Sequence, residues 1–413
     1  MKDTELYRHL LGIEPPWTVD RVDLDVSGQR IDVKLAHKRG RRWPCPECGE
    51  ACGLHDHAEE RTWRHLDSCQ FLTFIHAAIP RVDCRDHGVR QVRVPWAEPN
   101  SRFTLLFETL AIRLLLEASN SAVARLLGIS WDEAQGIKAR AVERGLAARE
   151  ELDPVALGVD EKSVGRGLGF FTLVYDHRRG CVAHIDDGRS KEALESFFLK
   201  LDPRQLARIE ALSMDMAKPY IAAAYEALPE PESTIVFDRF HVMKAMNHAV
   251  DEVRRAENKA LREQGDRRLV GAMHVLRYAE ANLPARYAAQ LDALRASNLK
   301  AARAWAIKEE LRELWSRESL DDALTLWKRW DAWAMRSRLE PVKRVARMVK
   351  RHLGGILNYY VHRVTNALAE STNGTIEWIK RTARGYRNRE NFKTAILFHC
   401  GGLKLHQLAP ASG

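Results

Sequence analysis

The sequence predicts a multidomain α/β plus α protein: a zinc-binding β unit, a helix-turn-helix, and an α/β domain interrupted by an all-α insertion. Three observations predict this class. Cysteines gather before residue 90, strand-like segments in residues 155–238 close on aspartates, and a long stretch of helical periodicity precedes a last amphipathic helix at residues 366–380. With 413 residues, of which 45% are hydrophobic, the chain can bury the cores of about two to four domains.

The charge balance favours a polyanionic partner. Lys and Arg total 65 against 56 acidic residues, a formal net charge of +9, so nucleic acid is the first candidate. The chain lacks both a long uncharged apolar window and a signal-peptide pattern, which predicts a cytosolic (cytoplasmic) protein without a membrane partner. In that reducing compartment, seven cysteines that lie mostly before residue 90 indicate metal binding more than disulfides.

Residues 1–98 are predicted to form a β unit with a zinc ribbon. Residues 19–33 alternate loosely about a Ser27-Gly28 turn, which indicates two strands, and residues 63–84 indicate two more. Two short knuckles, Cys-Pro-Glu-Cys and Cys-Arg-Asp-His, flank the second pair. We predict a closed structural Zn²⁺ site with four ligands, Cys45, Cys48, Cys84 and His87.

Other arrangements of this region stay open. Cys52, His55 and His57 lie close to the first knuckle and are rival ligands. The cysteines could also be packed and metal-free. Cys69 is predicted to be a buried strand residue.

Residues 99–152 are predicted to form a helix-turn-helix domain. Apolar spacing indicates helices at 103–117, 121–127 and 131–149, with Gly128 at the turn and a Ser130/Glu133 capping box starting the third. Ordinary three-helix packing is the alternative. The residues expected to face outward towards DNA are Gln135, Lys138, Arg140 and Arg144.

Residues 153–413 are predicted to form the α/β domain. Strands are expected at residues 155–160, 169–175, 181–185, 208–215 and 233–238, with helices at 191–201 and 218–228. Asp160, Asp215 and Asp238 close three of these strands. Each alone fits a turn or a helix cap, but together they predict a carboxylate cluster at one sheet edge. Such a cluster could hold two Mg²⁺ ions for phosphodiester chemistry.

A helical stretch at about residues 255–360 is predicted as an insertion. Its five tryptophans recur among Leu and Ala, which favours a core over base-stacking platforms: Trp305, Trp315, Trp327, Trp330 and Trp333. The helix at 366–380 then places Glu370, Asn373 and Glu377 on one face. A basic run follows, and Lys380, Arg381 and Arg384 are expected to contact the DNA backbone unless they are plain surface charge.

The order of these parts carries a resemblance that covers nearly the whole chain. Zinc knuckles, helix-turn-helix, GVDEKS, SMDM with Tyr220, FDRFH, the helical stretch and NALAESTNGTIEWIKRTARGYRN together resemble bacterial insertion-sequence transposases of the ISL type. These belong to the DDE superfamily, with an RNase H-like core. The resemblance implies that Asp160, Asp215 and Glu370 are a metal-binding catalytic triad, supported by Asp238 and His241.

The activity implied is binding of double-stranded DNA at the transposon ends, followed by strand cleavage and transfer to target DNA with Mg²⁺ or Mn²⁺. A homo-oligomer on DNA is expected from the same resemblance. Two alternatives stay open. One is a DNA-binding regulator with an inactive core, which would not need the three acidic residues, and the other is a metal-dependent nuclease without strand transfer.

Overall fold

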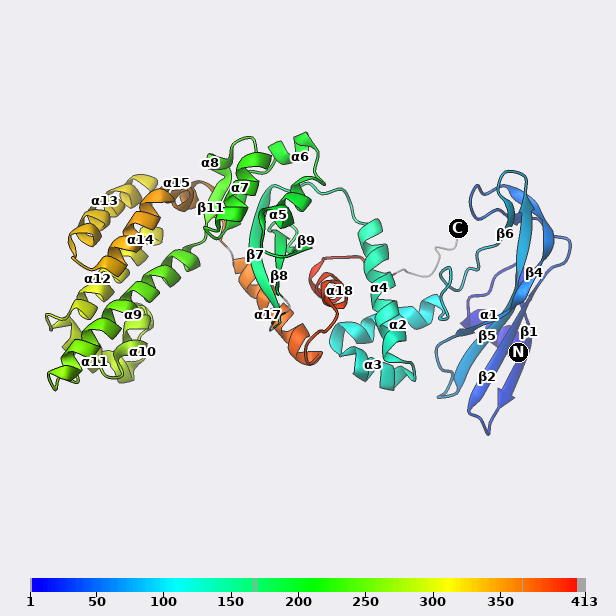
Figure 1. Ribbon diagram of the computed structural model, residues 1–413. Coiled ribbons are helices and arrows are strands. Elements are labelled where there is room, and N and C mark those ends of the chain that lie inside the picture. The colour runs from blue at the N-terminus through cyan, green and yellow to red at the C-terminus, as the bar shows by residue number, and fades with distance from the viewer. Residues whose placement is uncertain (1, 166, 168, 366, 407–413) are drawn as a thin grey trace. The chain divides into compact units, whose positions relative to one another are not determined.

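The structure, a computed structural model, describes residues 2–165, 167, 169–365 and 367–406 (Figure 1). The chain divides into two compact units. One comprises Met1–Arg149 with the stretch that begins at Leu403, and the other comprises Glu150–Gly402. None of the helices in the described part of the chain combines the length and apolar character needed to cross a membrane.

The first unit begins with a short helix and a mixed sheet. Its elements are α1 (Asp3–Leu10), β1 (Trp17–Asp25), β2 (Arg30–His37), β3 (Trp43–Pro44), β4 (Ala51–Arg64), β5 (Leu72–Cys84) and β6 (Gly88–Gln91). The sheet has the order β1-β2-β5-β4-β3, with β6 pairing β5. The predicted Ser27-Gly28 turn is confirmed, because the Asp25 carboxylate accepts hydrogen bonds from Ser27 Oγ and Gly28 N.

Four tryptophans fill the core of this sheet. Trp17 contacts Trp43 and Trp96, with ring centroids 5.4 and 4.9 Å apart, and Trp63 contacts Trp96 at 5.5 Å. Cys69, predicted to be buried in a strand, is instead exposed in the turn between β4 and β5, with φ 50°. That prediction was wrong because a residue between two strands can belong to the connection.

Three helices complete the first unit, as predicted. They are α2 (Leu105–Glu117), α3 (Asn120–Leu127) and α4 (Trp131–Ala147). Gly128 ends α3 in the left-handed region, and Ser130 and Glu133 form the capping box that starts α4.

The second unit is built on a five-stranded sheet. Its strands are β7 (Ala156–Gly165), β8 (Gly169–Asp176), β9 (Cys181–Asp187), β10 (Ala211–Met214) and β11 (Ile235–Phe237), in the order β11-β10-β7-β8-β9. β7, β8 and β9 are antiparallel neighbours, whereas β10 and β11 run parallel to β7. Asp215 and Asp238 follow their strands directly, as predicted. Asp160 does not end its strand, because pairing with β8 carries β7 on to Gly165.

Helices cover both faces of this sheet. They are α5 (Lys191–Phe198), α6 (Pro203–Ala207), α7 (Lys218–Ala227), α8 (Pro231–Thr234), α17 (Ala367–Thr382) and α18 (Arg389–Cys400). Because strand side chains alternate between faces, Val174 packs in the core with α5 and α7, whereas Leu173 and Tyr175 pack with α17 and α18. Asn366, the expected first residue of the last helix, lies outside the described residues.

Between β11 and α17, the described residues form helices. These are α9 (Arg239–Glu263), α10 (Ala272–Arg277), α11 (Ala288–Arg295), α12 (Lys300–Arg312), α13 (Leu320–Arg336), α14 (Glu340–Arg351), α15 (Leu353–Leu357) and α16 (Tyr359–His362), with short 3-10 turns. Trp305, Trp315 and Trp330 are buried in their core, as predicted. Trp327 is partly buried, and Trp333 is exposed, contrary to the prediction.

Candidate active site and zinc centre

The pairing of the parallel strands determines where Asp160, Asp215 and Asp238 lie relative to one another. Ser213 pairs with Gly158 across β10 and β7, and Met214 pairs with Phe237 across β10 and β11. Continuing the same register by one or two residues places Asp215 level with Asp160 on one side and with Asp238 on the other. The sheet therefore brings three carboxylates to one edge, although they are far apart in the sequence.

Asp160 is held from two directions. Its Oδ2 accepts a hydrogen bond of 2.6 Å from Asn373 Nδ2 on α17, and its Oδ1 accepts one of 2.8 Å from Glu161 N. Burial raises the pKa of Asp160, and the nearby charge of Asp215 acts in the same direction. The site thus gathers negative charge in a partly desolvated place, which is a setting suited to a divalent cation.

Further contacts fasten α17 to β7. Lys162 Nζ donates to the Asn373 carbonyl oxygen at 3.3 Å and lies 2.9 Å from the Glu377 carboxylate. Lys380 Nζ donates to the Ser163 carbonyl oxygen at 3.2 Å. Asn373, Glu377 and Lys380 therefore share the face of α17 that meets the strand, as helical spacing predicts.

Glu370 lies on the same helix, one turn before Asn373. It is exposed and lines a cavity of about 330 Å³, together with Asp238, Phe240, Trp315 and Tyr359 among others. Within the described residues, the carboxylate oxygens of Asp160, Asp215 and Glu370 do not all lie within 4.8 Å of one another. The structure brings Glu370 to the same region as Asp238 without showing a preformed cage.

Asp238 and His241 form a linked pair at the start of α9. Asp238 Oδ1 accepts from Phe240 N at 3.0 Å and so caps the helix, while Oδ2 lies 3.1 Å from His241 Nδ1. This hydrogen bond, with help from the charges of Asp215 and Asp160, raises the pKa of His241. The pair therefore places a readily protonated imidazole beside the carboxylates.

The sequence patterns did not identify Glu161 as a candidate site residue. Burial raises the pKa of this carboxyl group, the charge of Asp215 raises it further, and Arg189 Nη1 lies 3.7 Å from the Glu161 carboxylate. The signal was available, because Glu161 directly follows Asp160 in the GVDEKS motif.

The zinc-ribbon cysteines come together as expected. The ligand atoms of Cys45, Cys48, Cys84 and His87 all lie within 4.8 Å of one another. Cys48 Sγ is 3.7 Å from Cys84 Sγ, and His87 Nδ1 is 3.6 Å from Cys84 Sγ. The hydrogen bond to His87 lowers the pKa of Cys84 to about 6, which favours the thiolate that Zn²⁺ requires.

The rival ligands have other contacts. His57 Nε2 lies 2.7 Å from His37 Nε2, and Cys52 Sγ donates to the Glu50 carbonyl oxygen at 3.3 Å. Burial raises the pKa of Cys52 to about 11. The donor set of three thiols and one imidazole fits a closed tetrahedral zinc site.

The outward orientation expected on α4 was wrong. Gln135 and Lys138 are buried, and both bond to Asn120 of α3: Asn120 Nδ2 donates to Gln135 Oε1 at 2.8 Å, and Lys138 Nζ donates to Asn120 Oδ1 at 2.7 Å. Helical periodicity places polar residues outside unless a polar network is buried, which is the case here.

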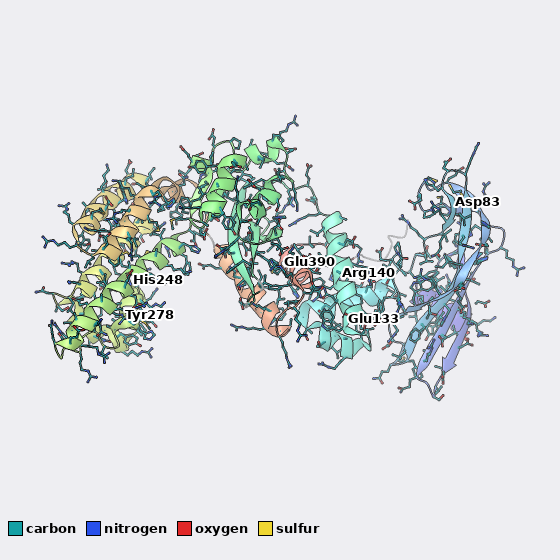
Figure 2. The ribbon with its side chains drawn as sticks, viewed as in Figure 1. Asp83, Glu133, Arg140, His248, Tyr278 and Glu390 are labelled. Atoms are coloured by element: carbon teal, nitrogen blue, oxygen red, sulfur yellow. The ribbon has the colours of Figure 1, made fainter. Side chains whose placement is uncertain are left out.

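The two arginines of α4 also point inward. Arg140, labelled in Figure 2, donates from Nε to Oε1 of the buried Glu108 at 3.2 Å. Arg144 Nη1 lies 3.4 Å from Glu108 Oε2. These contacts join α4 to α2. In contrast, Arg381 in the last turn of α17 and Arg384 just after the helix are exposed. Their exposure fits the predicted contact with a phosphate backbone and fits plain surface charge equally.

Comparison with known families matches three parts of the chain. Residues 157–396 match a family model described as a transposase of the DDE_Tnp_ISL3 type. Residues 92–142 match the helix-turn-helix domain of transposase family ISL3, and residues 41–87 match the zinc-finger of transposase IS204/IS1001/IS1096/IS1165.

Whole-chain relatives agree with these matches. The chain is 29% identical over 421 residues to the transposase for insertion sequence element IS1557 of Mycobacterium tuberculosis, covering 94% of this chain and 93% of the relative. It is 28% identical over 397 residues to the transposase for insertion sequence element IS1001 of Bordetella parapertussis, covering 95% and 97%.

Proposed function

The chain belongs to the ISL3 family of DDE transposases, and we propose that it cleaves and transfers DNA strands at the edge formed by Asp160, Asp215 and Glu370. One observation carries this assignment. The parallel register puts Asp160 and Asp215 side by side, and Asn373 of the Glu370 helix bonds directly to Asp160. The strand order, three antiparallel strands followed by two parallel ones, supports an RNase H-like core.

Each domain would have its own function. We assign residues 1–98 to the β unit and zinc ribbon, 99–152 to the helix-turn-helix, and 153–413 to the catalytic domain with its all-α insertion. The compact unit that holds this catalytic domain ends at Gly402, because the stretch from Leu403 groups with the first unit. The expected insertion at about residues 255–360 lies inside the helical region, which begins at Arg239 because α9 is continuous. The N-terminal domains would bind double-stranded DNA at the transposon ends, with Zn²⁺ fixing the ribbon.

The acidic edge would hold divalent metal, either Mg²⁺ or Mn²⁺. When bound, the ions neutralise charge on the attacking and leaving oxygens of the phosphodiester. Asn373 orients the Asp160 carboxylate, and the contacts of Lys162 hold α17 so that Glu370 faces the same cavity as Asp238. The hydrogen bond to Asp238 raises the pKa of His241, which favours a positively charged imidazole near the phosphate. Arg381 and Arg384 would position the backbone.

The reaction would proceed in two displacements. Water first attacks the phosphodiester at the transposon end and frees a 3′-hydroxyl. That hydroxyl then attacks target DNA at the same carboxylates, and no bond to the protein forms. We expect a dimer or larger assembly on DNA.

The test is strand cleavage of labelled DNA carrying the element's own ends, with Mg²⁺ or Mn²⁺. Wild type should cut, whereas Asp215→Ala and Glu370→Ala should bind the DNA without cutting. If both variants cut as well as wild type, the triad assignment is wrong. Products joined to a target duplex would distinguish a transposase from a nuclease, and binding without cleavage by every form would favour the regulator.

A further inference from the structure

A second cavity continues from the acidic one along α9. The cavity that contains Asp238 and Glu370 measures about 330 Å³, and its neighbour measures about 740 Å³. Phe240, Met243 and Arg312 line both of them. The two cavities therefore adjoin one another at these three residues, beside the proposed cleavage site and along α9. We call the pair of cavities the α9 groove.

An exposed aromatic ring lies where the two cavities meet. Phe240 is 55% exposed in the first turn of α9, two residues after Asp238. Its contact with His241 is edge-on, with ring centroids 5.6 Å apart and planes at 89°. An apolar ring so poorly covered contributes little to the core, but it offers a flat surface for stacking.

Cations line the groove on both sides of this ring. Arg239 lies in the acidic cavity, and Lys244 and Arg277 lie in its neighbour; all three are exposed. Within the described residues, these three side chains have no carboxylate partner, unlike Arg255, which pairs with Asp251, and Arg312, which lies 3.4 Å from Glu309. Unpaired cations around an aromatic ring are suited to phosphates.

The groove also contains groups that could bond to a base edge. Asn247 lines the larger cavity, and its side-chain oxygen is buried without a hydrogen-bond partner among the described residues. His248 of α9 and Tyr278, which follows α10, line the same cavity and are exposed (Figure 2). An unsatisfied buried acceptor costs free energy. Because the Asn247 residue is only partly buried, rotation of its amide would turn this acceptor towards a donor in the cavity.

We propose that the α9 groove binds an unpaired stretch of the DNA strand that adjoins the cleaved phosphodiester. Phe240 stacks on a base, Asn247 accepts a hydrogen bond from a base amino group, and Arg239, Lys244 and Arg277 contact phosphates. The strand is unpaired because an aromatic side chain can cover a base only when the base has left its neighbour in the duplex. The identity of this strand rests on the proposed function, since it is the acidic edge that implies DNA cleavage nearby.

The test measures binding without metal, so it needs no catalysis. The probe is a single-stranded oligodeoxynucleotide that carries 2-aminopurine, added to the full-length zinc-loaded protein in EDTA-free buffer without Mg²⁺ or Mn²⁺. Stacking on Phe240 should quench the fluorescence. Phe240→Ala should remove this quenching and weaken binding roughly 5- to 10-fold, whereas Phe240→Trp should keep both.

The controls separate stacking from charge and from folding. Tyr225 of α7 is 50% exposed and lies outside the lining of both cavities, so Tyr225→Ala should behave as wild type. Lys244→Gln should lower the slope of log affinity against log salt by about 0.7. Unchanged melting temperatures would show that the variants fold.

Two results would overturn the proposal: quenching that persists in Phe240→Ala, or groove substitutions that weaken duplex binding as much as single-strand binding. Asp215→Ala should still quench, because the quenching depends on Phe240. If wild type fails to cleave but Phe240 still governs quenching, the groove assignment stands and the proposed catalytic function fails. If cleavage depends on Asp215 but Phe240→Ala binds normally, the proposed catalytic function stands and the groove assignment fails.

Discussion

Asn373 Nδ2 donates a 2.6 Å hydrogen bond to Asp160 Oδ2, joining two residues that are 213 positions apart in the sequence. The bond links the strand of one proposed metal ligand to the helix of another, because Glu370 lies one turn before Asn373. Asn373 is therefore a positioning residue: it acts on the site through Asp160.

Removing the donor should loosen Asp160. We expect Asn373→Ala to lower strand cleavage by about 10- to 100-fold and to raise the Mg²⁺ concentration needed for half-maximal rate. Asn373→Asp should be worse, because it sets a second negative charge against Asp160. The measurement is cleavage of end DNA across a Mg²⁺ titration, with unchanged melting temperature as the folding control. An unaltered metal requirement in Asn373→Ala would show that the bond does not position the carboxylate.

The zinc centre predicts a difference between two cysteines. Cys84→Ser should lose bound zinc and lower the melting temperature of the first unit, since a structural zinc site contributes to folding. Cys69→Ser should retain about one zinc ion per chain, because Cys69 is exposed in a turn. Metal analysis of the purified variants checks both outcomes. Equal zinc content in the two variants would contradict the ligand set.

Two arginines should differ in the kind of defect that they produce. Arg140→Ala removes the guanidinium that pairs with the buried Glu108 carboxylate, so it should destabilise folding by about 2 kcal/mol or more. Arg381 is exposed, so Arg381→Ala should keep the melting temperature but reduce the salt slope of duplex binding by about 0.9. Thermal melting and salt-dependent affinity, measured on both variants, separate the two roles. Normal stability in Arg140→Ala would mean that this ion pair matters little.

Lys138 predicts a pH dependence of stability. Burial lowers its pKa from 10.5 to about 8. Since the folded pKa is below the unfolded one, the unfolded chain binds the proton more tightly between these values. Stability should therefore rise from pH 8 to pH 10.5, by about 3 kcal/mol from this group. Lys138→Met should lack this rise, and denaturant unfolding of both proteins against pH tests it. Parallel curves for the two would refute the buried amine as its source.

The sequence patterns predicted most of the regular elements for local reasons. Gly128 and the Ser130/Glu133 box define the ends of α3 and α4, because caps act over a few residues. Two knuckles at either end of a β pair were enough to predict the Cys45 to His87 cluster. At the acidic edge, Asp215 and Asp238 were readable as strand-terminal because the following residues start helices.

Tertiary contacts decided what the patterns could not. Gln135 and Lys138 look like surface residues in the sequence, but Asn120 of a neighbouring helix offers both a donor and an acceptor that bring them inside. The extent of β7 beyond Asp160 depends on pairing with β8, and Trp333 is exposed although its spacing resembles that of buried Trp330. The α9 groove could not be predicted, since it needs cavities lined by residues from distant helices.

The unbroken length of α9 restricts how this chain can change in evolution. The helix begins at the Asp238 cap and continues for 25 residues to Glu263. One residue inserted within it would turn everything beyond by about 100° and advance it by about 1.5 Å. Phe240 and Lys244 would then no longer share a face with the residues farther along the groove. Insertions and deletions should therefore be rare in α9 and tolerated instead in the connection that follows it, where a change of length alters no helical phase.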